Sequence, residues 1–516
     1  MESPIVSAAA MRAAEEAAFA RGVEVETLMD QAGAGLARAV SKFFPEPGKA
    51  IVFAGKGHNG GDALVAAARL KEAGWEIDLR LIFPEEDCAE LTRKKVAECR
   101  EIECGRDLGA DSPRKLSALP PLIILDGLLG LGSKHLLREP VRTAAQEINR
   151  LRREDNAFVF AVDLPTGLDG DNGDRDPDCV VADFTVTIGF AKHGLVGDHV
   201  VDLVGRIEVV PLADLVIAPV PANDQLASAH SLSAVLPRRK FSAYKNEFGR
   251  LGVVAGSQGF IGAALMTTQG ALRAGAGLVE LFVPKEIYPI VAAAAPAEAM
   301  VKPVRAYRDL LDEKMDVWAL GPGLGKSQAK DILRLIERAA APMVVDADGL
   351  NILADDAEVL KRCAGPRLLT PHPGEMRRMV DPGKMSRAGI TRSFTDALPV
   401  TLLLKGARTI VGERGRPLSY NSTGNPGMAT GGMGDVLTGV CAALVGQGLS
   451  LYDAARVGAW VCGRAAEIAV FENGESEESL LPRDVLDHLG AAFNELHRAE
   501  IAGLAVPRSG GLPPAD

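Results

Sequence analysis

Residues 425–440 carry the sequence NPGMATGGMGDVLTGV, a glycine-rich loop that leads directly into an apolar helical pattern. Glycines allow backbone N–H groups to converge on an anion at a helix N-terminus, where the helix dipole adds positive potential. Asp435 lies at the start of this helix, where it could accept a proton from an attacking hydroxyl. The stretch therefore predicts a phosphate cradle with a built-in general base. The alternative is a glycine-rich turn capped by an aspartate.

The segments before this loop alternate short apolar runs with polar or glycine-rich loops. The expected strands are 251–255, 278–283, 317–320, 343–345, 368–369 and 400–404. Helical patterns lie between several of them, including an alanine-rich helix from Gly262 to Ala274. Such alternation predicts a central, mostly parallel sheet with helices on both faces. No GxxxxGK[ST] motif is present, so a P-loop nucleotide site is excluded.

The first half of the chain repeats this alternation. Helical spacing over residues 8–41 predicts one or two helices, the second beginning near Val25. The expected strands are 50–54, 77–83, 122–125, 158–162 and 184–188. The sequence GKGHNGGD at residues 55–62 follows the first strand, which is where doubly wound folds hold phosphates. Its spacing is not that of the GxGxxG dinucleotide fingerprint. His58 in this loop could be catalytic, but a polar surface role is the more common one.

Polar side chains follow three of these strands. In an open parallel sheet the carboxyl ends of the strands line the binding crevice, so these side chains could converge. The residues concerned are Asn59, Asp62, Asp126, Asp163 and Thr166. Each aspartate alone is equally well explained as a turn or cap residue. Three such loops in one sheet favour a binding site.

Composition limits the possible classes of protein. A chain of 516 residues with 47% hydrophobic and 24% charged residues is typical of a soluble protein of two domains. The net charge of −11 argues against a broad nucleic-acid-binding face. Seven scattered cysteines without a CxxC pair predict free thiols in a reducing compartment. No signal peptide or long apolar stretch is seen, so we expect a cytoplasmic protein without a membrane segment.

Residues 212–233 contain prolines and no sustained period, which predicts a linker. We therefore expect domains at residues 1–218 and 225–502. The basic stretch RRKFSAYKNEFGR at residues 238–250 could bind phosphate, although solvated surface is equally plausible on charge alone.

The Asn59-Gly60-Gly61-Asp62 loop, Asp126 with its glycine-leucine loop, and the Asp163–Gly167 turn resemble the YjeF N-terminal domain of the NAD(P)HX epimerase family. The resemblance covers about residues 1 to 215 and implies a Rossmann-like three-layer sandwich. It implies potassium bound by Asn59, Asp126 and Thr166, with acid–base work by Asp163. The substrate contacts that it implies are His58, Asn59, Gly60, Gly61, Asp62, Gly130, Leu131, Gly132, Ser133, Lys134, His135, Leu136 and Asp163. His58 and Ala63 replace residues that are usually Asn and Gly in that family.

Four ordered motifs of the second half resemble the ADP- or ATP-dependent NAD(P)HX dehydratase family of the ribokinase superfamily, over about residues 225 to 500. They are Gly252 to Ser257, GPGLG at 321–325, TPHPGE at 370–375 and NPGM at 425–428. The substrate contacts implied are Ala263, Gly323, His372 and Asp435, with Asp435 catalytic. The nucleotide contacts implied are Lys405, Gly406, Ala407, Arg408, Thr409 and Gly434. Without the resemblance, His372 between two prolines could equally be a rigid-turn residue. Met433 stands where the family usually has a small residue or Thr.

Together the two resemblances predict a bifunctional repair enzyme for hydrated NADH and NADPH. The first domain would equilibrate the epimers of NADHX and NADPHX, and the second would phosphorylate and dehydrate the S epimer. Potassium, magnesium and ADP or ATP are the expected cofactors, with ADP the commoner donor among microbial members. We expect no nucleic-acid or membrane partner, and a homo-oligomer. The alternatives are a kinase of a small alcohol such as a vitamin precursor, or a first domain that serves as an interaction module, as in RNA-decapping scaffolds.

Overall fold

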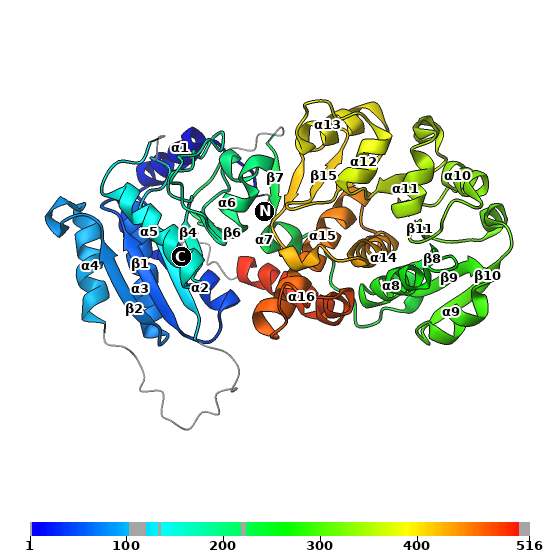
Figure 1. Ribbon diagram of the computed structural model, residues 1–516, viewed down its shortest axis with the longest axis horizontal. Helices are drawn as coiled ribbons and strands as arrows, with labels where there is room; N and C mark the ends of the chain where they lie inside the picture. The colour runs from blue at the N-terminus through cyan, green and yellow to red at the C-terminus, as the bar shows by residue number, and fades with distance from the viewer. Residues whose placement is uncertain (1–2, 103–119, 133–135, 218–222, 505–516) are drawn as a thin grey trace, which may run out of the picture. The chain divides into compact units, whose positions relative to one another are not determined.

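The computed structural model describes residues 3–102, 120–132, 136–217 and 223–504 (Figure 1). Contacts between residues divide the chain into two compact units, the first running from Ser3 to Asp224 and the second beginning at Gln225. Each unit is built around its own sheet. The expected two-domain α/β fold is therefore confirmed.

The first unit has a six-stranded, wholly parallel sheet in the order β2-β1-β3-β4-β5-β6. Its strands are β1 (Lys49–Ala54), β2 (Glu76–Leu81), β3 (Leu122–Gly127), β4 (Phe158–Val162), β5 (Phe184–Ile188) and β6 (Arg206–Val210). Its helices are α1 (Ala8–Ala20), α2 (Val25–Phe43), α3 (His58–Glu72), α4 (Glu90–Glu101), α5 (Val141–Glu154) and α6 (Val201–Val204). The strand order reverses at β1, which pairs with both β2 and β3, so the crevice beyond these strands is the expected ligand site.

The second unit has a ten-stranded mixed sheet in the order β10-β9-β8-β11-β12-β13-β14-β15-β16-β7. Its strands are β7 (Gln225–Ala227), β8 (Arg250–Val254), β9 (Leu278–Pro284), β10 (Ala299–Val304), β11 (Val317–Leu320), β12 (Met343–Val345), β13 (Arg367–Leu369), β14 (Thr401–Leu404), β15 (Ile410–Glu413) and β16 (Ser419–Asn421). The pairing is parallel from β10 to β14, whereas β15 is antiparallel to both β14 and β16.

Helices cover both faces of the second sheet. They are α7 (Ala229–Ser233), α8 (Ile261–Arg273), α9 (Tyr288–Ala294), α10 (Ala329–Arg338), α11 (Ala347–Leu353), α12 (Pro373–Met379), α13 (Arg387–Ala397), α14 (Met433–Gly446), α15 (Leu451–Glu467) and α16 (Pro482–Leu504). Successive strand residues belong to different cores, since side chains alternate across a strand. Ala319 lies in the core with α8, α14 and α15, whereas Leu320 lies in the core with α10 and α11.

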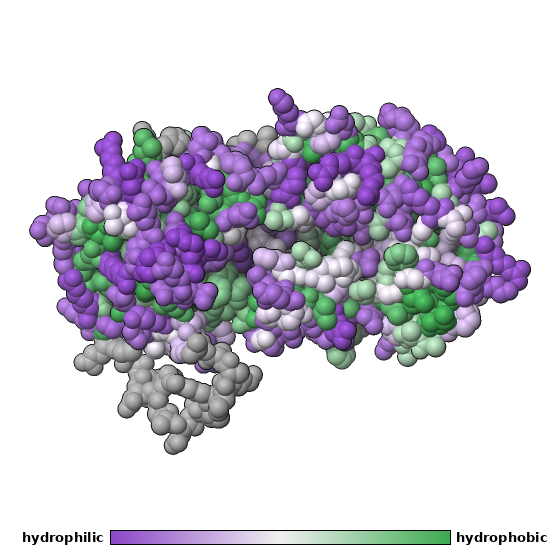
Figure 2. All heavy atoms as spheres, in the orientation of Figure 1, coloured by the Kyte–Doolittle hydropathy of each residue, from purple (hydrophilic) through white to green (hydrophobic). Residues whose placement is uncertain are grey.

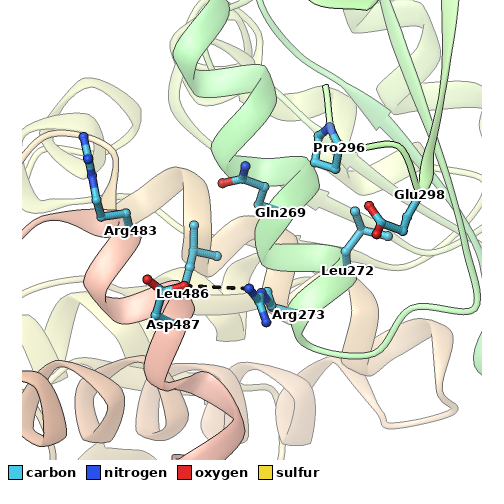
Figure 3. A pocket seen from close by; sticks show the side chains of 8 residues that line it. All are labelled: Gln269, Leu272, Arg273, Pro296, Glu298, Arg483, Leu486 and Asp487. Atoms are coloured by element: carbon cyan, nitrogen blue, oxygen red, sulfur yellow. Dashed lines mark ion pairs between the residues drawn. The ribbon is translucent and has the colours of Figure 1, made fainter. Parts of the chain in front are cut away.

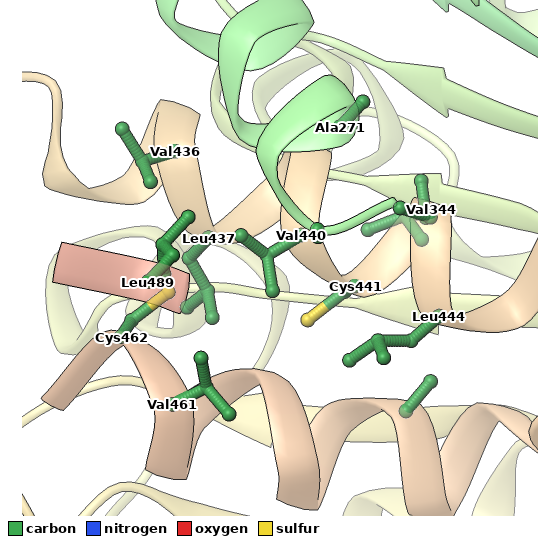
Figure 4. Close-up of a cluster of buried hydrophobic side chains, with 14 of the residues drawn as sticks. Ala271, Val344, Val436, Leu437, Val440, Cys441, Leu444, Val461, Cys462 and Leu489 are labelled. Carbon is green, nitrogen blue, oxygen red and sulfur yellow. The ribbon is translucent and has the colours of Figure 1, made fainter. Parts of the chain in front are cut away.

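Helix α14 is apolar around most of its circumference because it is enclosed by other elements. Figure 4 shows its side chains Val440, Cys441 and Leu444 among residues of α8, α15 and the sheet. Val440 and Leu444 are fully buried, and burying one such side chain contributes about 1.5–3 kcal/mol. The helix that follows the glycine-rich loop is therefore rigidly placed.

Three sequence expectations need correction. Helix α3 begins at His58, so the Asn-Gly-Gly-Asp segment is its first turn rather than a loop. The predicted linker is too long, because β7 and α7 lie within residues 212–233. The sequence also failed to predict four strands, β6, β10, β15 and β16. For β10 the reason is its place at a sheet edge, where part of the strand is exposed and apolar periodicity is weak.

The visible surface is mostly polar, with an apolar patch over α9 in Figure 2. Ile290 of α9 and Met300 of the edge strand β10 are exposed apolar side chains. Over the described ranges, no helix has the length and apolar character needed to cross a membrane.

Candidate active sites

Asp126 near the end of β3 is a completely buried carboxylate in the first unit. Its Oδ1 accepts the Thr166 hydroxyl at 2.7 Å and its Oδ2 accepts the Thr166 backbone N–H at 2.8 Å. Burial raises the pKa of Asp126 to about 6, although these hydrogen bonds oppose the shift. Within the described parts of the chain, no lysine or arginine forms an ion pair with Asp126.

Asn59 joins this group through the loop that follows β3. Its Nδ2 donates to the Leu129 carbonyl at 3.0 Å, and the Leu129 N–H donates to Thr166 Oγ1 at 3.2 Å. The predicted potassium residues Asn59, Asp126 and Thr166 are thus brought together. Their hard oxygens and the uncompensated buried charge fit an alkali cation.

Asp163 follows β4 with a φ of +66°, in the left-handed region. Its Oδ1 accepts the Ile188 N–H at 3.0 Å and the Thr187 hydroxyl at 3.2 Å. The same oxygen forms an ion pair with Lys192, which is fully buried and also donates to the Ile188 carbonyl at 2.9 Å. Sequence analysis missed Lys192. The only signal was a charged residue four positions after the end of β5, which is weak without a structure.

Two further carboxylates lie near this ion pair. Burial raises the pKa of Asp62 well above its ordinary value, and the negative charges of Asp163 and Glu15 add to the effect. Burial and the charge of Asp163 also raise the pKa of Glu15 on α1. One lysine among three carboxylates favours retention of a proton within the group. Glu15 was not among the predicted residues.

The other predicted contacts of the first unit differ in their exposure. Gly60 and Gly61 are buried in the first turn of α3, whereas His58 is exposed. A side chain at Gly130 would come within 3.2 Å of Asn59 Oδ1, so this glycine allows the loop to approach α3. Leu131 is half-buried, and Gly132 and Leu136 are exposed. Ser133, Lys134 and His135 lie outside the described residues.

In the second unit, Asp435 lies in the first turn of α14, after Gly432 with a φ of +97°. The first amides of this turn have no acceptor within the helix, and apart from the Met433 N–H, which donates to the Thr430 carbonyl at 3.4 Å, they can donate to an anion. Burial raises the pKa of Asp435 to about 7, the nearby Asp346 carboxylate adds to the shift, and Lys405 opposes it. A carboxylate with this pKa is suited to accept a proton near neutral pH.

Asp346 is buried at the N-cap of α11, directly after β12. Its Oδ1 accepts Lys405 Nζ at 2.7 Å, and its Oδ2 accepts the Thr438 hydroxyl at 2.9 Å. A side chain at Gly434 would come within 3.1 Å of Lys405 Nζ. Lys405 therefore lies beside the cradle. The sequence placed Asp346 in a strand-end loop but gave it no role.

His372 caps α12, and its Nδ1 accepts the Gly374 N–H at 2.9 Å. Its ring is half-exposed, and its Nε2 lies 3.5 Å from Glu375 Oε1. Glu375 Oε2 is in turn 3.9 Å from Lys405 Nζ. Burial would lower the pKa of Lys405, but the charges of Asp346, Glu375 and Asp435 outweigh this effect and raise it.

Gly323 and Ala263 meet at the switch point between β8 and β11. A side chain at Gly323 would lie 3.1 Å from Ala263 Cβ. The predicted nucleotide segment, residues 405–409, connects β14 to β15. Gly406 and Ala407 are exposed and Thr409 is half-buried, but Arg408 is only 8% exposed, so it is the least accessible of these contacts.

Two family models match the chain. One, for NAD(P)H-hydrate dehydratase, matches residues 251–489, and the other, for the YjeF-related protein N-terminus, matches residues 25–194. A bifunctional NAD(P)H-hydrate repair enzyme from Moorella thermoacetica is 36% identical, covering 91% of this chain and 92% of the relative. The chain belongs to the bifunctional NAD(P)H-hydrate repair enzyme family. The resemblances stated from the motifs and the prediction of an enzyme are confirmed.

Other members of this repair enzyme family show the same correspondence. A relative of the same name from Escherichia coli is 33% identical, covering 94% of this chain and 92% of the relative. Among solved structures, an ADP/ATP-dependent NAD(P)H-hydrate dehydratase from Bacillus subtilis, co-crystallised with ATP and Mg²⁺, is 27% identical. The match covers 52% of this chain and 98% of the Bacillus subtilis chain, with a TM-score of 0.46.

A pocket of about 580 Å³ in this repair enzyme homologue is lined by residues other than the predicted ones (Figure 3). It is lined by α8, the start of α16 and the segment after α9, and the Arg273–Asp487 ion pair spans it at 3.7 Å. None of its lining residues belongs to either predicted site. In the described chain, no group of three or more His, Cys, Asp or Glu residues could hold a metal ion by itself.

Proposed function

We propose that the first unit interconverts the R and S epimers of hydrated NADH and NADPH, and that the second unit dehydrates the S epimer at the expense of ADP or ATP. The observation that carries this proposal is Asp435. It lies in the first turn of α14, directly after the glycine-rich loop, with a pKa of about 7 and Lys405 close by.

Dehydration requires a better leaving group than hydroxide. Asp435 would accept the proton of the substrate hydroxyl as its oxygen attacks the terminal phosphorus of the nucleotide. The amides of Gly432 to Gly434 would stabilise the negative charge on the transferring phosphoryl group. Loss of phosphate, together with a ring proton, then restores the double bond of NADH or NADPH. Magnesium would accompany the nucleotide phosphates, as is usual for such donors.

Epimerisation requires loss and return of a hydroxyl on the carbon beside the ring nitrogen. Asp62 would donate its proton so that the hydroxyl leaves as water and an iminium ion forms. Asp163, oriented by its contact with Lys192, would accept a proton from the water that adds to the opposite face. Two carboxyl groups in different environments suit these opposite roles.

Potassium would be held by Asn59, Asp126 and Thr166. When bound, it would neutralise the buried Asp126 charge and fix the loop at residues 128–130 beside α3. Four further points stay predictions: the use of magnesium, the choice between ADP and ATP, a homo-oligomeric state and a cytoplasmic location. Light scattering on the purified chain would test the oligomeric state.

The test is recovery of absorbance at 340 nm from a mixed preparation of R and S NADHX, with ADP, ATP or no nucleotide. Nucleotide-dependent recovery beyond the S fraction requires both activities and identifies the donor. Recovery that stops at the S fraction would contradict the role of the first unit. No recovery with either nucleotide would overturn the proposal.

A further inference from the structure

Arg464 lies at the centre of a group of charges that the proposed chemistry does not use, and within this group Arg464 and Glu467 are buried. Its guanidinium contacts Glu472 Oε1 and Glu495 Oε2, each at 2.6 Å, and Glu467 Oε2 at 3.5 Å. Arg464 is 3% exposed and Glu467 is fully buried. Buried charges are costly unless they are paired and hydrogen-bonded. The buried pair of Arg464 and Glu467 in the last turn of α15 therefore needs an explanation.

The second oxygen of Glu467 provides one. Its Oε1 accepts the backbone N–H of Gly424 at 2.7 Å. The neighbouring residues are attached to the same helix, since the Thr423 hydroxyl donates to the Trp460 carbonyl at 2.8 Å and Asn425 Nδ2 donates to the Ala466 carbonyl at 3.1 Å. The segment before the glycine-rich loop is thus fastened along the C-terminal half of α15.

Successive turns connect Gly424 to the cradle. The Met428 N–H donates to the Asn425 carbonyl at 3.1 Å, and the Thr430 hydroxyl donates to the Gly427 carbonyl at 2.9 Å. The Met433 N–H then donates to the Thr430 carbonyl at 3.4 Å. Each of these turns is held by a hydrogen bond to the residues before it. A displacement of Gly424 would therefore shift the first turn of α14 as well.

We propose that Glu467 is a positioning residue for phosphoryl transfer: its carboxylate, oriented by Arg464, fixes Gly424 and with it the place of the cradle amides and Asp435. This inference rests on the proposed function of the second unit. It adds a residue that lies outside the nucleotide and substrate contacts, 32 positions after Asp435 in the sequence, on a different helix.

Two conservative variants separate this role from simple charge pairing. Glu467→Gln keeps an acceptor for the Gly424 N–H but removes the charge beside Arg464. Glu467→Asp keeps the charge but withdraws the acceptor by one methylene. Glu472→Gln is the matched control. Glu472 lies on the π-helical turn Ile468–Glu472 and pairs with the same guanidinium, so this variant also removes a carboxylate charge beside Arg464. The kcat and KM of dehydration are measured in the full chain, with epimerisation as the internal control.

Positioning predicts a kcat about tenfold lower for Glu467→Asp, since misplaced transition-state donors lower kcat, and a hydrate KM within about twofold of wild type. Glu467→Gln and Glu472→Gln should keep kcat within about threefold. A larger loss in Glu467→Gln than in Glu467→Asp, or wild-type kcat in Glu467→Asp, would overturn the role.

Gly424→Ala tests the same contact from the loop, in case Glu467→Asp does not fold. Gly424 has a φ of +118°, and an added Cβ would meet Met428 Sδ at 3.2 Å, so the loop must shift while the Arg464 group stays intact. The same split between kcat and KM is expected, and wild-type kcat would count against the inference. Absence of dehydration in the wild-type chain would instead refute the proposed function itself.

Discussion

Asp126 and Asp346 are two buried aspartates, one in each unit, and each accepts a threonine hydroxyl. Thr166 donates to Asp126 at 2.7 Å, and Thr438 donates to Asp346 at 2.9 Å. The two aspartates differ in whether a basic side chain is paired with them. Asp346 has Lys405 at 2.7 Å, whereas Asp126 forms no ion pair with a basic side chain in the described residues.

This difference separates two ways of keeping a carboxylate inside a protein. The second unit supplies a covalently attached cation, which also lies beside the reacting Asp435. The first unit leaves the charge to be neutralised by a proton or by an ion from solution, because burial without a partner disfavours ionisation. We therefore expect only the first unit to respond to alkali cations.

The largest expected effect is the loss of one activity without the other. Asp435→Asn removes the proposed base and should lower the kcat of dehydration by about 10² to 10⁴-fold. Epimerisation, followed by chromatography of the R and S forms, should be unchanged because Asp163 and Asp62 lie in the other unit. Equal loss of both activities would contradict independent sites.

Neutralising each buried aspartate should have opposite effects on stability. Asp346→Asn leaves Lys405 without its nearest partner and should destabilise the second unit by about 3 kcal/mol. Asp126→Asn, measured without potassium, should instead stabilise the first unit by up to about 3 kcal/mol at a pH above the pKa of Asp126, because it removes a buried charge. Calorimetric unfolding of the full chain at pH 8 in a tetramethylammonium buffer would measure both.

The pKa of Asp126 also sets a direction with pH. Since its folded pKa of about 6 exceeds the ordinary value of 3.8, the folded state binds the proton more tightly. Stability without potassium should therefore fall as pH rises from about 4 to above 6. Potassium should reverse this loss in wild type but not in Asp126→Asn, and a cation response in Asp126→Asn would contradict the assignment.

The threonine pair offers a smaller, matched comparison. Thr166→Val removes an oxygen from the proposed cation site and should raise the potassium concentration for half-maximal epimerisation about tenfold. Thr438→Val removes the equivalent hydroxyl beside Asp346 and should leave potassium dependence unchanged. If potassium supports only dehydration, the cation has been assigned to the wrong unit.

The smallest expected effect is a shift in pH dependence. Dehydration should rise with pH through about 7, because Asp435 must be ionised to accept a proton. Asp346→Asn removes a charge that raises this pKa and should move the rise to lower pH, whereas Lys405→Met should move it to higher pH. Rate profiles of kcat/KM between pH 5 and 9 would show these shifts, and identical profiles would exclude the coupling.

Much of the fold could be predicted from local pattern. The bounds of β4, β5, β11 and β12 were predicted to the residue, because buried parallel strands give continuous apolar runs. The family and its two activities followed from ordered motifs. The edge strand β10 carries exposed residues and the three-residue β16 gives little pattern, so periodicity was insufficient for them.

The partners of the site residues could not be predicted in the same way. Lys192 contacts Asp163 only because β5 lies beside β4. Glu467 contacts Gly424 directly, although they are 43 positions apart in the sequence. Such contacts depend on tertiary packing rather than on spacing along the chain. A buried lysine or glutamate in an apolar segment is the one local sign, and it does not name its partner.

Strand β7 begins directly at the boundary between the units and pairs with β16 at the outer edge of the second sheet. The first three residues of the second unit therefore protect its last strand from pairing with other chains. A gene fission that separated the two activities would have to fall upstream of codon 225. A split a few codons later would remove β7 and leave β16 as an uncovered edge strand, which would make the catalytic half prone to aggregate.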